Sequence, residues 1–258
     1  MDALEHDQQD PAAGAVSTAK GETTTVVLSR SQQTVGRRMA ESKATIPHFS
    51  LQMDVDMEGC LELHGALGAD MAATTGDPQE PGPTPAPTYN DMVVKATALA
   101  LREHPRVNSS YRDGEVQLHS RVNVGMAVAT EDALVVPTVF DADMKSLGEI
   151  AGETLALAER VRSATVTPPE LGGATFTVSN LGMYGVHSFT AVVNPPQAAI
   201  LSVGSLEPRA VARDGKLTVR HTLTLTLACD HRILYGADAA EFLASIRESL
   251  ETPSALIT

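Results

Sequence analysis

Residues 216–230 constrain the fold most strongly, because apolar and polar residues alternate there over the length of a long β-strand. Successive side chains of a strand point to opposite faces of a sheet, so one face of this segment is apolar and the other is rich in threonine. The apolar face consists of Leu217, Val219, Leu223, Leu225, Leu227 and Cys229. The pair Asp214-Gly215 predicts a hairpin turn in front of the strand. Residues 237–251 follow with helical spacing, so the chain is expected to pass from this strand into a helix.

The remaining apolar segments predict several more strands and helices. Strands are expected at 23–29, 48–57, 121–130, 134–140, 174–179, 190–194 and 198–206. Helices are expected at 30–45, 58–67, 89–105 and 146–163. Because several strands follow one another without a helix between them, this order excludes a doubly wound parallel sheet and predicts a mixed α/β fold.

The composition predicts one main domain with polar additions. Residues 23–258 carry the periodic segments, whereas the polar and acidic residues 1–22 predict a disordered tail or the remnant of a linker. Residues 68–88 are dense in proline and glycine and predict a mobile loop. No stretch approaches the ~20 apolar residues of a membrane span, and the N-terminus lacks the features of a signal peptide. A cytoplasmic protein without a membrane partner is therefore expected.

Charge and cysteine content narrow the classes of partner and cofactor. A net charge of −13 disfavours nucleic acid, because phosphate binding needs a basic face. Cys60 and Cys229 are the two cysteines, and we interpret both as free thiols. None of the eight histidines forms an HxxH or HExxH pair, and the cysteines lack CxxC spacing, so no metal site is predicted.

His231 is the candidate functional residue, because it lies where the long strand ends and the last helix approaches. Considered alone, a histidine with the parity of the apolar strand face is most simply a buried core residue. Its neighbours Asp230 and Arg232 are charged, which is unusual beside a buried core residue. Gly236 allows a sharp turn before the helix. A neutral imidazole is also a suitable general base toward a thiol at pH 7. Both readings remain open at this point.

Six ordered segments resemble the catalytic domain of the 2-oxo acid dehydrogenase acyltransferases, the E2 components, which include the dihydrolipoamide acetyltransferases. The similarity covers about residues 26–258. The segments are "RRMAESKATIPHF" (37–49), "YNDMVVKATALALREHPRVNSSY" (89–111), "NVGMAVATEDALVVPTV" (123–139), "GGATFTVSNLGMYGV" (172–186), "VVNPPQAAILSVG" (192–204) and "ACDHRILYGADAAEFL" (228–243).

The resemblance implies a chloramphenicol acetyltransferase-like fold, with a mixed β-sheet flanked by helices, assembled as a homotrimer or as a core of 24 or 60 copies. It also implies transfer of an acyl group, most simply acetyl, between a lipoyl thiol and coenzyme A in a channel at the subunit interface. The lipoyl domain and the E1 and E3 components would be the partners.

The same resemblance assigns roles to single residues. His231 would be the general base and Ser179 the donor to the tetrahedral oxyanion, although Ser179 alone would be read as a turn residue. Coenzyme A contacts are expected at Arg30, Ser42 and Lys43, within a basic segment of an acidic protein, and at Asn180.

The chain departs from the family pattern in two respects. Tyr235 stands where the H-x-x-x-D-G motif has an aspartate that holds an arginine and shapes the site. Residues 1–22 are too short for a lipoyl domain, so we expect a catalytic fragment or a short form that receives lipoyl groups from another domain or chain. A non-catalytic structural core, and an acyltransferase with a small acceptor, are the alternatives.

The C-terminus carries Leu256 and Ile257. The family uses such apolar tails to join trimers, so these two residues are expected either to do so or to pack against their own chain.

Overall fold

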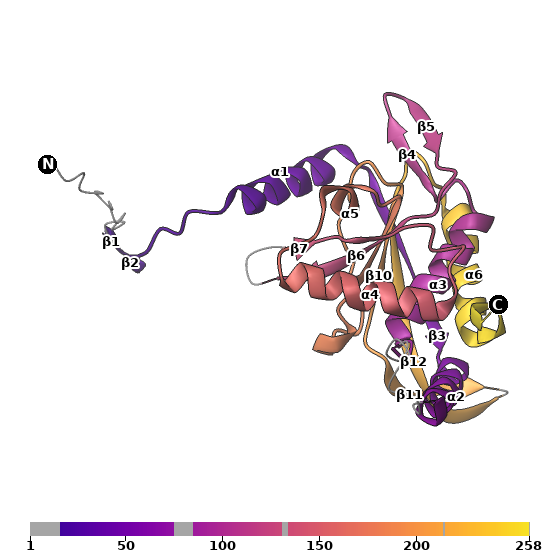
Figure 1. The fold of residues 1–258 in the computed structure, drawn as a ribbon. Helices are drawn as coiled ribbons and strands as arrows, with labels where there is room; N and C mark the ends of the chain where they lie inside the picture. The colour runs from indigo at the N-terminus through magenta and orange to yellow at the C-terminus, as the bar shows by residue number, and fades with distance from the viewer. Residues whose placement is uncertain (1–15, 75–84, 131–133, 214, 258) are drawn as a thin grey trace, which may run out of the picture.

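A single mixed sheet organises the computed structural model, which describes residues 16–74, 85–130, 134–213 and 215–257 (Figure 1). The strand order of this 8-stranded sheet is β11-β12-β10-β9-β6-β7, with β3 beside β12 and β8 beside β6. The central strand β9 is parallel to both β6 and β10, whereas β12 is antiparallel to β10, β11 and β3. The strands are β3 (His48–Asp56), β6 (Val124–Ala129), β7 (Leu134–Val135), β8 (Thr138–Val139), β9 (Phe176–Asn180), β10 (Ala199–Val203), β11 (Glu207–Arg213) and β12 (Lys216–Asp230). The predicted mixed α/β sheet flanked by helices is thereby confirmed.

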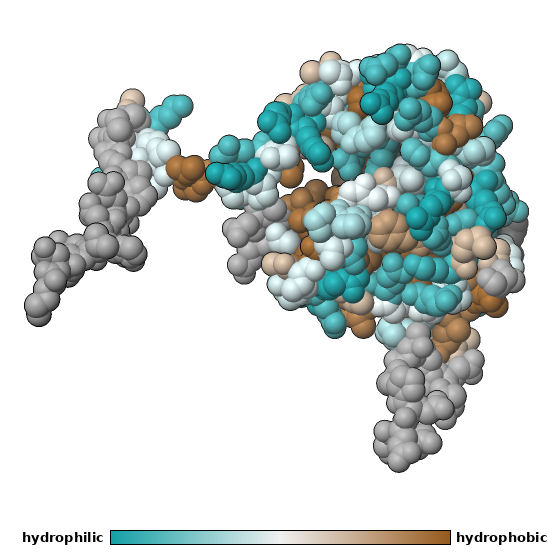
Figure 2. Space-filling model, turned by 45° about the horizontal axis from the view of Figure 1, so that its top comes forward, coloured by the Kyte–Doolittle hydropathy of each residue, from teal (hydrophilic) through white to brown (hydrophobic). Residues whose placement is uncertain are grey.

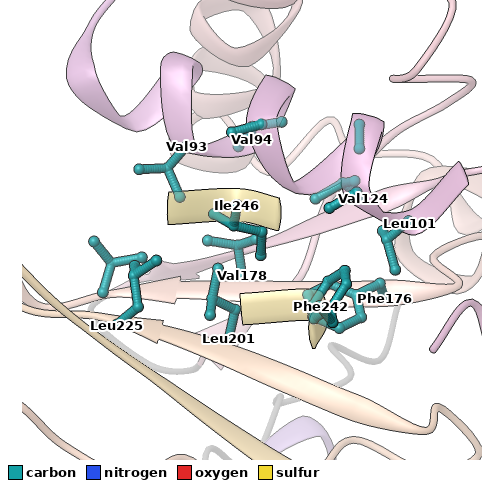
Figure 3. Packing of buried hydrophobic residues seen from close by; sticks show 14 of the residues in the cluster. Val93, Val94, Leu101, Val124, Phe176, Val178, Leu201, Leu225, Phe242 and Ile246 are labelled. Atoms are coloured by element: carbon teal, nitrogen blue, oxygen red, sulfur yellow. The ribbon is translucent and has the colours of Figure 1, made fainter. Parts of the chain in front are cut away.

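Helices cover one face of the sheet and enclose the hydrophobic core. They are α2 (Glu58–Thr74), α3 (Tyr89–Glu103), α4 (Leu147–Arg162) and α6 (Gly236–Glu251). Side chains from α3 and α6 meet apolar side chains of β9, β10 and β12 (Figure 3). At the centre, the rings of Phe176 and Phe242 lie edge to face with their centroids 5.6 Å apart.

Local sequence signals explain where the helices begin. Ser29, Thr88 and Ser146 each form a capping box with the residue three positions later, as Ser146 and Glu149 do in front of α4. Such a box satisfies backbone N–H groups that a helix leaves unpaired at its start. The helices predicted at 30–45 and 146–163 are confirmed as α1 (Arg30–Thr45) and α4, and the long strand 216–230 is confirmed as β12.

The opposite face of the sheet carries a row of polar side chains beside a small buried apolar cluster of Ile46, Val193, Ile200 and Ala228. Ser179, Ser202 and Thr226 lie in one row across β9, β10 and β12. The loop that follows β9 crosses this face, where the N–H of Ala191 donates to the hydroxyl of Ser202 at 3.2 Å. Gly204 permits the close crossing, since a Cβ at this residue would lie 1.9 Å from the carbonyl oxygen of His187.

Two predicted strands are wrong. Residues 24–29 and 190–194 carry apolar side chains but pair with no strand of the described chain. A strand requires a neighbour for its backbone hydrogen bonds, and periodicity within a short segment does not reveal whether one is available. Residues 24–29 instead leave the body of the molecule as an extended segment between α1 and the hairpin of β1 (Val16–Thr18) and β2 (Gly21–Thr23). Val26, Val27 and Leu28 make the hydrophobic patch on this arm (Figure 2), and Val27 is 85% exposed.

The loops also differ in part from expectation. The helix predicted at 58–67 continues as α2 through Thr74, because residues 68–74 include alanine and methionine and contain no proline. Of the loop predicted at 68–88, residues 75–84 lie outside the described residues, as do residues 1–15 of the predicted tail. The hairpin of β4 (Ser109–Arg112) and β5 (Glu115–Leu118) was not predicted, although its Asp113-Gly114 turn, with positive φ at both residues, is a hairpin signal. The short helix α5 (Pro168–Gly172) was not predicted either.

The C-terminal residues take separate courses. Leu256, in the 3₁₀ segment η2 (Pro253–Ile257), is buried in the core of its own chain, whereas Ile257 is exposed. Leu256 therefore packs within its own chain and is not available to join trimers. None of the described helices is long and apolar enough to cross a bilayer.

Candidate active site

The strand β12 ends at Asp230, and His231 is the first residue of the turn that follows. The backbone N–H groups of Ile233 and Leu234 both donate to the carbonyl of Asp230 at 3.0 Å, and the N–H of His231 donates to the carbonyl of Pro47 at 3.0 Å. Because the chain turns before His231, its side chain leaves the apolar strand face and is exposed, unlike that of buried Cys229. The reading of His231 as a buried core histidine is wrong.

Two aromatic rings flank the imidazole of His231. The ring of Phe49, on β3, lies 4.5 Å away between centroids, at an interplanar angle of 47°. The ring of Tyr235 lies 5.7 Å away, at 68°. Strand pairing explains the first contact, because Phe49 is the partner of Cys229 and the next pair is His48 with Asp230.

Asp230 and Arg232 anchor the turn. The carboxylate of Asp230 is buried and accepts the Nε and Nη2 of Arg232 at 2.9 Å and 2.6 Å, and also the backbone N–H of Arg232. This hydrogen bonding raises the pKa of the Arg232 guanidinium above its usual value. The same guanidinium lies 4.0 Å from the ring centroid of Tyr111, which connects the turn to the β4–β5 hairpin.

Ser179 lies near the carboxyl end of β9 and is half-buried. Its neighbours across the sheet are Ala127 on β6 and Ser202 on β10. Period-two alternation places Ser179 on the polar face, opposite buried Val178.

Ser179 and His231 of one chain are far apart. Ser179 shares a row with Thr226, two strands away, whereas His231 follows the end of β12. At a rise of about 3.3 Å per residue and a strand spacing of about 4.8 Å, their Cα atoms are separated by about 16 Å along the strands and about 10 Å across them. These two residues of the same chain therefore cannot contact one reacting thioester.

A hollow lined by both cationic and anionic side chains borders the His231 turn. It has a volume of about 470 Å³ and lies between the C-terminal half of α1, the β4–β5 hairpin and the turn. Three arginines line it, Arg38, Arg112 and Arg232, together with three acidic residues, Glu41, Asp113 and Asp230. Of the arginines, only Arg38 belongs to the basic segment around Arg30 and Lys43. Arg112 and Arg232 are distant from that segment in the sequence, and the tertiary structure brings them to the hollow.

The predicted coenzyme A residues do not form one cluster within the chain. Arg30 begins α1, and Ser42 and Lys43 lie near its other end, about 18 Å along the helix from Arg30 at about 1.5 Å per residue. The buried hydroxyl of Ser42 donates to the carbonyl of Val193 at 2.7 Å, so its proton already serves a contact within the chain. Lys43 is exposed.

Asn180 also has internal partners. Its Nδ2 donates to Asn90 Oδ1 at 3.0 Å, and its Oδ1 accepts the N–H of Gly182 at 2.8 Å. The first bond joins the end of β9 to the start of α3, and the second lies within the loop that follows β9. A role of Asn180 toward coenzyme A stays a prediction.

Neither cysteine has the surroundings of a nucleophile. Cys60 and Cys229 are free and buried, and burial raises the pKa of each thiol to about 12. Among the described residues, no group of three or more His, Cys, Asp or Glu side chains is arranged to hold a metal ion.

Comparison with known proteins identifies the family. A family model described as 2-oxoacid dehydrogenases acyltransferase (catalytic domain) matches residues 20–258. The chain belongs to this family. The acyltransferase component of the pyruvate dehydrogenase complex from Rhizobium meliloti is 39% identical over 226 residues, which are 88% of this chain and 49% of that protein. Component 2 from Arabidopsis thaliana, which is mitochondrial, is 41% identical over 85% of this chain and 40% of its own length. The acyltransferase domain described here spans about half the length of such relatives.

Solved structures show the same fold. The dihydrolipoamide acetyltransferase of Azotobacter vinelandii matches with a TM-score of 0.85 and 30% identity, over 96% of this acyltransferase domain and 100% of that chain. A cubic core of the pyruvate dehydrogenase multienzyme complex matches with a TM-score of 0.84 and 32% identity, over the same shares.

Proposed function

We propose that this chain transfers an acetyl group between coenzyme A and dihydrolipoamide. The observation that carries the proposal is the exposed imidazole of His231 at the end of β12, together with Ser179 on β9. The Azotobacter structure is described as a study of the roles of a serine, a histidine and an asparagine in that enzyme's catalytic mechanism. Ser179, His231 and Tyr235 follow one another here at the same intervals as those three residues follow one another there.

The chemistry needs a base and an oxyanion donor. The imidazole of His231 takes the proton of the attacking thiol, and the resulting thiolate adds to the carbonyl carbon of the thioester. The hydroxyl of Ser179 donates a hydrogen bond to the oxyanion of the tetrahedral intermediate. When the intermediate collapses, the carbon–sulfur bond to the departing thiol breaks, and His231 returns the proton to that sulfur. Acyl group and proton are then exchanged between the two thiols, with no net oxidation.

The separation of Ser179 and His231 supports a site shared between two copies of the chain. If each site takes His231 from one copy and Ser179 from the next, a closed ring of copies fills all sites equally. We infer a homotrimer, or a higher core built from trimers. The exposed arm with Val26, Val27 and Leu28 supports association, because a monomer would leave this apolar segment in water.

The substrates and partners follow from the same proposal. Coenzyme A is anionic, and Arg38, in the hollow beside the His231 turn, is a candidate to bind its phosphates, with Arg30 and Lys43 as further candidates. Arg112 and Arg232 also line this hollow, where each lies against an aspartate. The lipoyl group would be supplied by another domain or chain, and E1 and E3 components would complete the complex. The cytoplasmic location stays a prediction, because the Arabidopsis relative is mitochondrial.

Acetyl transfer from acetyl-CoA to free dihydrolipoamide tests the proposal directly. We expect clear activity from the wild type, a loss of about 10²- to 10⁴-fold in His231→Ala, and a loss of about 10²- to 10³-fold in Ser179→Ala. Leu217→Ala, an exposed position at the other end of β12, is the matched control and should retain full activity. An assembled wild type that transfers no acetyl, succinyl or branched acyl group would instead support the structural core.

A further inference from the structure

We propose that Tyr235 is a positioning residue for the base His231 and that Arg106 holds the Tyr235 ring in place. The inference rests on the proposed function, since it concerns the orientation of the same imidazole. It assigns a role to a side chain that stands at the position of the asparagine in the Azotobacter enzyme.

The imidazole of His231 needs an orienting contact, because rotation about its χ2 bond is only weakly restricted by the side chain itself. Within the described part of the chain, the imidazole packs against the rings of Phe49 and Tyr235, and the backbone N–H of His231 makes a hydrogen bond to Pro47. Phe49 restricts rotation of the imidazole from the side of β3, and Tyr235 restricts it from the start of α6. Ring contacts therefore do the work that a hydrogen-bonded carboxylate does for many catalytic histidines.

Arg106 fixes the Tyr235 ring relative to the turn. Its Nε and Nη2 both donate to the carbonyl of Ile233, at 3.1 Å and 2.9 Å, which ties the guanidinium to the segment between His231 and Tyr235. Its Cζ then lies 5.4 Å from the centroid of the Tyr235 ring, in the range of a cation–π contact. The guanidinium thus anchors the ring.

The backbone of Tyr235 is fixed as well. Its N–H donates to Asp238 Oδ2 at 2.9 Å, and its carbonyl accepts the N–H of Ala239 in the first turn of α6. With backbone and ring both held, the T-shaped contact with His231 has a defined geometry. A ring that is 53% exposed yet held by these contacts is better suited to orient a neighbour than to fill the core.

The aromatic ring, and not the phenol hydroxyl, carries this role, so Tyr235→Phe and Tyr235→Leu separate the two. We expect Tyr235→Phe to stay within about twofold of wild-type kcat. Tyr235→Leu keeps bulk but lacks a ring, and we expect its kcat to fall by between about twofold and tenfold, the worth of one aromatic pair. The KM values for acetyl-CoA and dihydrolipoamide should not change, because the role concerns the base and not substrate binding.

A double-mutant cycle makes the assignment specific. In a His231→Ala background, Tyr235→Leu should cause no further loss, because the residue it orients is gone. A loss of the same size in that background would overturn the proposal. So would an unchanged kcat in Tyr235→Leu, or a rise confined to KM, which would assign the ring to substrate contact.

Crystal structures of the assembled wild type, Tyr235→Phe and Tyr235→Leu provide a readout that does not depend on turnover. We expect one imidazole orientation in the first two proteins and more than one in Tyr235→Leu. A single unchanged orientation in all three would overturn the proposal. A wild type without transfer activity would refute the proposed function, and the imidazole orientations would still decide whether Tyr235 positions His231.

Discussion

Ser179 and His231 lie on the same sheet, but different parts of the structure hold them. Ser179 is within a central strand, with parallel neighbours on both sides, so backbone hydrogen bonds fix its position. His231 lies beyond the last strand pair, where its N–H still donates to the carbonyl of Pro47. The orientation of its imidazole depends on the side chains of neighbouring segments.

This difference follows from what each residue does in the proposed reaction. An oxyanion donor must be present at a fixed point, which a central strand provides without special side chains. A base must present one ring nitrogen to a thiol and must remain accessible, so it lies at an exposed turn with its own supporting contacts. The turn at the end of β12 is therefore expected to be the more sensitive region to side-chain changes around it.

The test with the largest expected effect asks whether Ser179 of one copy and His231 of another copy form one active site. Co-expression of His231→Ala and Ser179→Ala chains with different tags, followed by purification over both tags, yields mixed assemblies. A site recovers when its two contributing chains carry complementary intact residues, so each mixed trimer should have one active site and restore about a third of wild-type acetyl transfer. In a larger core, where selection for both tags does not remove uniform trimers, the expected fraction is about a quarter. Each variant alone should be nearly inactive.

The control for this experiment is co-expression of His231→Ala with the double variant His231→Ala/Ser179→Ala. No site in those assemblies has an intact base, so no activity should return. If the complementary mixture is no more active than its two components, the two residues do not come from different chains.

The second test removes the ion pair that anchors the His231 turn. Arg232→Ala leaves the Asp230 carboxylate, which is 1% exposed, buried without its charged partner. We expect a loss of about 3 kcal/mol in the free energy of unfolding, measured from the urea midpoint. The matched control is Arg121→Ala, because the Arg121–Asp141 pair is also doubly hydrogen-bonded but exposed, and its loss should cost under about 1 kcal/mol. Equal losses would contradict an anchoring role for the buried pair.

The smallest expected effect concerns opening of β12 next to His231. Cys229 lies beside the turn and Cys60 lies on α2, and burial raises the pKa of both thiols to about 12. Because the thiolate is the reactive form, a maleimide or disulfide reagent should label neither residue appreciably at pH 7 in the native protein. Rapid labelling of Cys229, but not of Cys60, under these conditions would show that the end of β12 opens more readily than the core.

Much of the local structure could be predicted from the sequence. The alternation of 216–230 and the helical spacing of 30–45 and 146–163 depend on neighbouring residues alone, and β12, α1 and α4 confirm them. Segments 24–29 and 190–194 have similar apolar content but form no strands, because pairing depends on partners elsewhere in the chain. The β4–β5 hairpin, by contrast, had a readable Asp-Gly turn signal.

Some features of the candidate site could likewise be predicted from the sequence, whereas others depend on the tertiary structure. The sequence by itself determined the family, the position of His231 at the end of a strand, and Ser179 as its proposed partner, because ordered motifs record residue type and spacing. Only the tertiary structure decided that His231 is exposed, that Ser179 of the same chain lies far from it, and that Arg106 and Tyr235 support its turn. The physical reason is that strand register and side-chain packing join residues distant in the chain, and no local pattern specifies those distances.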